Sequence, residues 1–125
     1  MSRPVQRASV AGTGTVVAER LRLADTHWTR LRGLLGTREL PVGEGLWIRP
    51  CRQVHMFGMR YAIDVVFLDD ASRIVGLAAE LQPWRISPLV KAATSVLELP
   101  AGTIARTGLR ADQALTLEAR TPSAG

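Results

Sequence analysis

Short apolar segments separated by turn residues run along most of the chain, and apolar and polar positions alternate within them. In the segment 16–23, Val17 and Leu21 lie on one side of an extended chain, and Arg20 and Arg22 lie on the other. This alternation is typical of a strand with one buried face. Gly, Pro and Asp separate it from later segments of similar length. The pattern predicts strands at 16–23, 46–48, 73–81, 95–99 and 114–118, a core strand within the run 51–69, and one helical turn at 103–107.

A different spacing follows the first predicted strand. Trp28, Leu31, Leu34 and Leu35 form one apolar stripe at helical spacing, and Gly36 is a residue type at which helices commonly end. We therefore expect a short helix there. The elements together predict a mostly β (α+β) fold: a compact, small barrel-like sheet of six or seven short strands, with one short helix after the first strand.

The length of 125 residues is enough for one domain with its own core. We expect a flexible N-terminal segment at residues 1–14, a single globular domain at 15–119 and a flexible tail at 120–125. No apolar stretch approaches the roughly 20 residues that cross a bilayer, and residues 1–20 lack the apolar centre of a secretory signal. With a single cysteine, these features predict a cytoplasmic protein without a membrane span.

Charge is uneven along the chain, whose formal net charge is +5. Residues 1–60 hold ten arginines and four acidic residues, whereas residues 61–125 hold six basic and seven acidic residues. A basic half can attract phosphate groups, so phosphate or RNA binding is one hypothesis, although a solvated basic surface is the favoured interpretation. The arginines that would bind phosphate are Arg20, Arg22, Arg30, Arg32, Arg49 and Arg52.

Four segments in a fixed order carry a resemblance to a known family. They are 28–36 (WTRLRGLLG), 45–48 (GLWI), 55–68 (HMFGMRYAIDVVFL) and 96–102 (VLELPAG). Together they resemble the family called domain of unknown function 192, over nearly the whole chain. The resemblance implies a single mostly-β domain with a short helix after the first strand. It implies no established activity, cofactor or partner.

Asp64 is a carboxylate inside a strand that is otherwise apolar on both faces. Such a strand is expected at the centre of a sheet, which buries the aspartate and requires a partner for it. An arginine is the natural partner, and Arg32 or Arg60 is expected to supply it. The favoured interpretation is a structural ion pair. The alternatives are a polar group at the mouth of a ligand pocket and a general acid or base.

Cys51, His55 and Met59 are ligand types that suit a soft metal ion. In an extended chain, however, residues four apart are separated by roughly 13 Å, too far for two ligands of one ion. The sequence therefore predicts no metal site, and no cofactor. Arg49 and Arg52 flank Cys51 and favour its thiolate, but the sequence shows no base positioned to activate it.

No strong catalytic motif occurs in the chain, so the leading hypothesis is a non-enzymatic accessory module that binds a small ligand or a protein partner. One alternative is a small hydrolase-like enzyme that uses Asp64 and His55, which must then lie within hydrogen-bond reach of each other. The other is the phosphate or RNA binding described above. The residues predicted to form the ligand-binding site are Arg32, His55, Met59, Asp64, Trp84 and Arg85.

Overall fold

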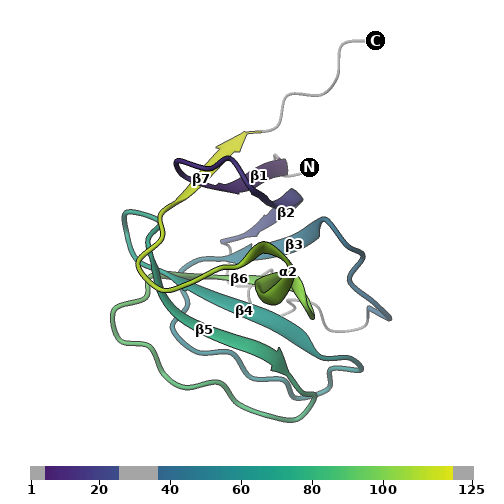
Figure 1. Cartoon of the computed structure of the whole chain (residues 1–125). Coiled ribbons are helices and arrows are strands. Elements are labelled where there is room, and N and C mark those ends of the chain that lie inside the picture. The colour runs from purple at the N-terminus through teal and green to yellow at the C-terminus, as the bar shows by residue number, and fades with distance from the viewer. Residues whose placement is uncertain (1–4, 26–36, 120–125) are drawn as a thin grey trace.

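The computed structural model describes residues 5–25 and 37–119. Within these residues the chain forms seven strands and one helix (Figure 1). The helix is α2 (Thr103–Thr107), which follows the sixth strand. The strands are β1 (Val5–Val10), β2 (Val16–Ala24), β3 (Glu44–Ile48), β4 (Ile63–Leu68), β5 (Ile74–Leu81), β6 (Ser95–Pro100) and β7 (Leu115–Ala119).

These strands form one sheet in the order β5-β4-β6-β3-β2-β1-β7. Neighbours are antiparallel except β2 and β3, which are parallel. The sheet curls until its two edges meet at one end, where Arg73 forms a β-bridge with Ala114 and the Leu115 amide donates to the Ser72 carbonyl at 2.8 Å. The mostly-β class predicted from the sequence is confirmed, and the sheet is a curled half-barrel.

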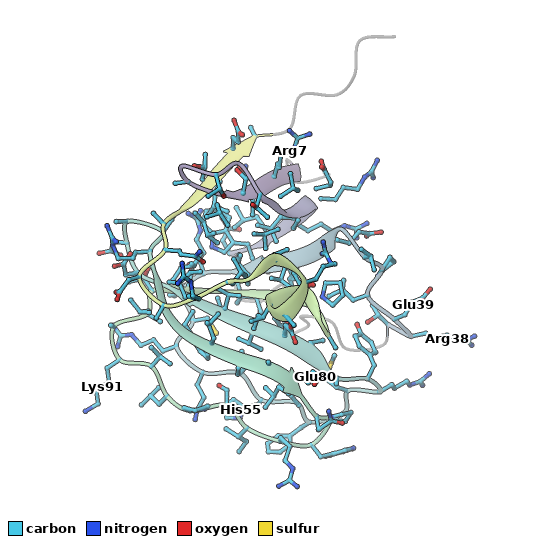
Figure 2. The ribbon with its side chains drawn as sticks, viewed as in Figure 1. Arg7, Arg38, Glu39, His55, Glu80 and Lys91 are labelled. Atoms are coloured by element: carbon cyan, nitrogen blue, oxygen red, sulfur yellow. The ribbon has the colours of Figure 1, made fainter. Side chains whose placement is uncertain are left out.

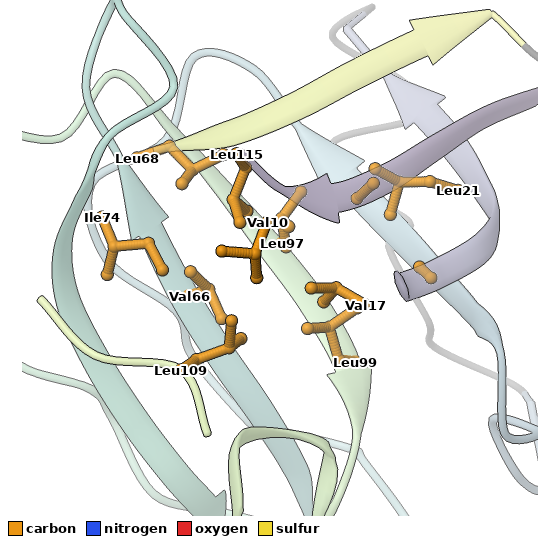
Figure 3. Close-up of a cluster of buried hydrophobic side chains, with 12 residues drawn as sticks. Val10, Val17, Leu21, Val66, Leu68, Ile74, Leu97, Leu99, Leu109 and Leu115 are labelled. Carbon is orange, nitrogen blue, oxygen red and sulfur yellow. The ribbon is translucent and has the colours of Figure 1, made fainter. Parts of the chain in front are cut away.

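One hydrophobic cluster, which we call the inner core, lies inside the curl of the sheet (Figure 3). It contains Val66 and Leu68 of β4 together with Leu97 and Leu99 of β6, all fully buried. Residues from β1 and β7 close over them, because the curl brings these strands opposite β4 and β6. Its members are Ala8, Val10, Val17, Ala18, Leu21, Val66, Leu68, Ile74, Leu97, Leu99, Leu109 and Leu115.

A second cluster, the outer core, covers the opposite face of the same strands. Ile63, Val65 and Phe67 of β4 point into it, so all six residues of β4 are buried, as the alternation of the sequence predicts. The irregular segments 51–62 and 82–93 cover this face. The members are Ala24, Leu46, Ile48, Val54, Met56, Met59, Ile63, Val65, Phe67, Ala93 and Val96.

The prediction of a flexible segment over residues 1–14 is wrong for residues 5–10, which form β1. Ala8 and Val10 of this strand are buried in the inner core. β1 pairs on one side with β2 and on the other with β7, so its backbone hydrogen bonds are made on both sides. The alternation in this segment is too weak to predict a strand, and two distant partners stabilise it instead.

The described helix also departs from the predicted arrangement, because it follows β6 and not the first strand. The helix expected at about residues 28–36 lies outside the described residues. The expected helical turn at 103–107 is present as α2, between Gly102 and Gly108, whose φ angles are 94° and 68°. Glycine adopts this left-handed region without steric cost, which explains both ends. In the described part of the chain, no helix is long and apolar enough to cross a membrane.

Candidate functional site

Asp64 is fully buried on the inner face of β4, but its partners are not those expected from the sequence. Its Oδ1 accepts a hydrogen bond from the Glu80 amide at 2.8 Å, and its Oδ2 accepts one from the Ile104 amide at 2.7 Å. The predicted pairing with Arg60 is wrong, since Arg60 is exposed and the Asp64 oxygens bind backbone amides. The other proposed partner, Arg32, lies outside the described residues.

Two irregularities of the backbone explain why a carboxylate is needed at this place. The pairing of β4 with β5 shifts register around Asp64, and Glu80 in the shifted stretch has a φ of 51°. The first turn of α2 is the second irregularity, because Gly102 at its N-cap offers no side chain to accept hydrogen bonds. One aspartate accepts from an amide of each element. Asp64 therefore joins β4, β5 and α2, which is a structural role.

Two loop segments run antiparallel over the outer core and hold the exposed residues of the predicted site. The Met56 amide donates to the Arg85 carbonyl at 2.8 Å, and the Trp84 amide donates to the Met56 carbonyl at 2.8 Å. His55 forms a β-bridge with Ile86. The chain alternates here as in a strand: Met56 points into the outer core, so His55 and Ile86 point to solvent.

The exposed side chains of these segments form what we call the aromatic surface, defined as His55, Phe57, Trp84 and Ile86. The His55 and Phe57 rings meet edge to face with centroids 5.8 Å apart, and the Phe57 and Trp84 centroids are 6.2 Å apart. Trp84 is 68% exposed, Phe57 49% and Ile86 48%. Aromatic rings that contact one another, and that no other part of the protein covers, leave a continuous apolar area facing water. Such an area is typical of an interaction site.

Trp84 also has an unusual backbone conformation, with a φ of 68°. A residue other than glycine in this left-handed region costs roughly 1–2 kcal/mol. Hydrogen bonds on each side hold it: the Trp84 amide donates to Met56 and the Arg85 amide donates to the Gln82 carbonyl at 3.2 Å. A strained backbone that displays a large apolar ring to solvent favours a binding role over a structural one.

The loops around the aromatic surface are basic. Residues 50–62 and 82–94 contain Arg52, Arg60, Arg85 and Lys91, all exposed, and no acidic residue. Figure 2 shows His55 and Lys91 at the same end of the molecule, far from Arg7. The surface therefore combines exposed rings with positive charge.

Glu98 is a buried carboxylate that the sequence reasoning missed. It lies on β6, where it is opposite Leu46 of β3 and Val65 of β4, and its side chain faces the outer core. It is 7% exposed, and no hydrogen bond or ion pair joins it to another described residue. Burial raises the pKa of Glu98 to about 7. The sequence contains a signal for the burial of Glu98. In the segment 96–100, Glu98 shares a strand face with Val96, which is a core residue.

Tyr61 lies at the edge of the outer core near Glu98. Its hydroxyl is 2.7 Å from the Thr37 hydroxyl, with which it shares a hydrogen bond. Burial raises the pKa of Tyr61, the hydrogen bond with Thr37 lowers it, and the negative charge of Glu98 raises it further.

A pocket of about 450 Å³ lies beside the first residue of β6, and no residue of the aromatic surface lines it. Inside it, the Arg49 guanidinium is 4.4 Å from the Trp47 ring centre, and the Trp47 indole donates to the Ser95 hydroxyl at 3.0 Å. Of the residues predicted for the ligand-binding site, none that the structure describes lines it. The lining residues are Asp25, Trp47, Arg49, Pro50, Asp69, Asp70, Ser72, Thr94 and Ser95.

The ligand types Cys51, His55 and Met59 are separated by the fold. The Cys51 thiol donates to the Gln53 carbonyl at 3.2 Å, His55 is exposed and Met59 is buried in the outer core. Within residues 5–25 and 37–119, no three His, Cys, Asp or Glu side chains lie close enough to hold a metal ion.

The structure thus brings together only part of the predicted site. His55, Trp84 and Arg85 lie on the two paired loops, while Met59 is inside the outer core beneath them. Asp64 is on the opposite face of the sheet, with its oxygens held by backbone amides, so it is not in reach of His55. The geometry does not support the hydrolase alternative.

The arginines of the phosphate-binding hypothesis have different surroundings. Arg20 and Arg22 are exposed on β2, Arg49 stacks on Trp47, and the Arg52 side chain donates to the Ala93 carbonyl at 3.1 Å. The remaining two, Arg30 and Arg32, lie outside the described residues.

Comparisons with known sequences identify a family and add no activity. The model of the DUF192 family, described as Uncharacterized ACR, matches residues 8–117. A UPF0127 protein of Thermococcus sibiricus is 34% identical over 96 residues, which cover 73% of this chain and 61% of that protein. The chain thus spans less than two thirds of the length of this relative.

Two crystal structures are similar in fold. A protein of unknown function from Novosphingobium aromaticivorans has a TM-score of 0.77 at 25% identity, with 88% of this chain and 83% of that chain covered. A Sinorhizobium meliloti protein, provisionally described as a transcription regulator, has a TM-score of 0.80, with 94% of this chain and 97% of that chain covered. At 19% identity the latter shows the shared fold alone.

Proposed function

The chain belongs to the DUF192 family, which is described as uncharacterised, and we propose that it is a non-enzymatic accessory module that binds its partner through the aromatic surface. The observation that carries the proposal is the contact of three exposed rings, His55, Phe57 and Trp84, on loops that backbone hydrogen bonds join to each other. Rings that are already ordered lose little conformational entropy when a partner covers them.

The chemistry of the surface indicates the chemistry of the partner. Arg52, Arg60, Arg85 and Lys91 give the two loops a positive charge that no acidic residue within them offsets. Charge complementarity therefore favours a partner with a negatively charged contact surface. The exposed Trp84 and Ile86 side chains require that the same surface also be apolar.

The proposed site keeps His55, Trp84 and Arg85 from the sequence prediction and adds Phe57 and Ile86. Asp64 is left out, because its two oxygens are used by the backbone of β5 and α2. The proposed location in the cytoplasm stays a prediction from the sequence.

A titration followed by amide NMR of the ¹⁵N-labelled protein tests this function. The probes are a polyglutamate peptide, a single-stranded oligothymidylate and phosphatidylglycerol vesicles, each carrying negative charge. At least one is expected to shift or broaden the amide signals of His55, Phe57 and Trp84, and added salt is expected to reverse the effect. Changes centred on Arg20 and Arg22 of β2, or no change with any probe, would refute the proposal.

A further inference from the structure

Exposed apolar side chains are concentrated at one end of the described molecule. Of the five large hydrophobic residues that are exposed in the described part of the chain, four lie in residues 57–89 on the two paired loops. The fifth, Val42, is in a separate loop. The four are Trp84 at 68%, Leu89 at 56%, Phe57 at 49% and Ile86 at 48% exposure. Such a concentration indicates a surface that is covered in use.

The residue types of these four exposed side chains distinguish between nucleic acid and a bilayer as the partner. Single-stranded nucleic acid is bound by aromatic rings that stack on bases, assisted by basic side chains. Ile86 and Leu89 have no planar face to stack, yet they are 48% and 56% exposed. Tryptophan beside aliphatic residues and Arg or Lys is instead the combination of proteins that insert side chains at the interface of an anionic bilayer.

The backbone of the loops also fits a bilayer interface. The Met56, Trp84 and Ser87 amides donate to the carbonyls of Arg85, Met56 and Val54, at 2.8, 2.8 and 2.9 Å. Further along the loops, the Val90 amide donates to the Arg52 carbonyl at 2.9 Å. Backbone groups that are already paired lose little when apolar side chains leave water.

We propose that the aromatic surface, with Leu89, docks on a lipid bilayer rich in anionic headgroups. Trp84, Phe57, Ile86 and Leu89 enter the interfacial layer, and the arginines and lysine of the two loops contact the headgroup phosphates. The proposal rests on the function proposed above and names its partner. It places the chain on the membrane surface as a peripheral protein.

Sedimentation with vesicles tests the proposal on the full chain. One set of vesicles contains equal parts of phosphatidylglycerol and phosphatidylcholine, and the other contains phosphatidylcholine alone. The wild type is expected to bind the anionic vesicles at least about tenfold more strongly than the neutral ones. Trp84→Ala is expected to weaken that binding at least about fivefold, because a large interfacial side chain is lost.

Matched variants test whether vesicle binding depends on the residues of the two loops or on any exposed apolar or basic residue. Ile86→Ala and Val42→Ala each shorten an exposed aliphatic side chain, but only the first is expected to reduce binding. Arg85→Gln and Arg20→Gln each remove an exposed arginine, and again only the first, beside Trp84, is expected to reduce it by more than about twofold. Melting curves of all variants check that each is folded.

Three results would overturn the proposal. The first is equal binding to neutral and anionic vesicles, and the second is an equal loss with Arg20→Gln and Arg85→Gln, which indicates adsorption through net charge. The third is no vesicle binding while polyglutamate or oligothymidylate still perturbs Phe57 and Trp84 in the NMR titration. In that case the bilayer is wrong and the binding function stands. If no probe binds, both proposals are wrong.

Discussion

Replacing the buried carboxylate with an amide in Glu98→Gln tests the electrostatics of the outer core. The Glu98 pKa rises from 4.5 to about 7 on folding, because the charged form loses its hydration inside the outer core. The folded protein therefore holds a proton that the unfolded chain releases between these pH values. One pKa unit is worth about 1.4 kcal/mol, so the wild type should lose about 3 kcal/mol of stability as pH rises through this window.

The variant lacks this proton and should not show this loss. Urea unfolding of both proteins at about pH 5 and about pH 8 gives the free energy of unfolding at each pH. The two proteins should differ by less than about 1 kcal/mol at the lower pH, where Glu98 is neutral and nearly isosteric with glutamine. At the higher pH the variant should be more stable by about 2–3 kcal/mol. Glu118→Gln, at an exposed position of β7, is the matched control.

The pKa of Tyr61 gives an independent measurement of the negative charge of Glu98. It is the single tyrosine of the chain, so alkaline absorbance of tyrosinate reports it alone. Because the negative charge of Glu98 raises the Tyr61 pKa, Glu98→Gln should lower that pKa and Glu118→Gln should not. A stability difference between wild type and Glu98→Gln that does not change with pH would refute the reasoning. So would a wild type that gains stability relative to the variant as pH rises.

Three further substitutions test the structural assignments by urea unfolding. Asp64→Asn should cost about 1–3 kcal/mol, since an amide has one oxygen for two backbone donors, and an unchanged midpoint would contradict the structural role. Gly45→Ala should cost about 1–3 kcal/mol, because its Cβ would lie 2.8 Å from a Leu99 methyl group; a wild-type midpoint would show that the core yields there. Trp84→Gly should keep or raise stability by up to about 1 kcal/mol, since glycine relieves the positive φ, while vesicle binding is lost. A marked loss of stability in this last variant would assign the ring a structural role.

The aromatic surface shows how far the sequence could predict the site. His55, Trp84 and Arg85 were identified individually as polar and aromatic residues near prolines and a core strand. The contact of Phe57 with Trp84 depends on the pairing of two loops that are about thirty residues apart in sequence. No local pattern encodes that pairing, which is why Phe57 and Ile86 were not included among the predicted residues.

Elements with a local signal are predictable from the sequence alone. Alternation in β4 predicted that both of its faces are buried, because neighbouring side chains of a strand point to opposite faces whatever covers them. The positions of most strands and of the α2 turn follow from the same local rules and from Gly102 and Gly108.

The surroundings of each buried polar group depend on the tertiary fold. The sequence predicted that Asp64 is buried, but its partners are amides of β5 and α2, made available by a register shift and by a glycine at the N-cap. Glu98 has the same kind of strand setting and no partner among the described residues, so its pKa rises instead. Burial follows from alternation, which is local, whereas hydrogen bonds and charge depend on distant segments that the curl of the sheet brings together.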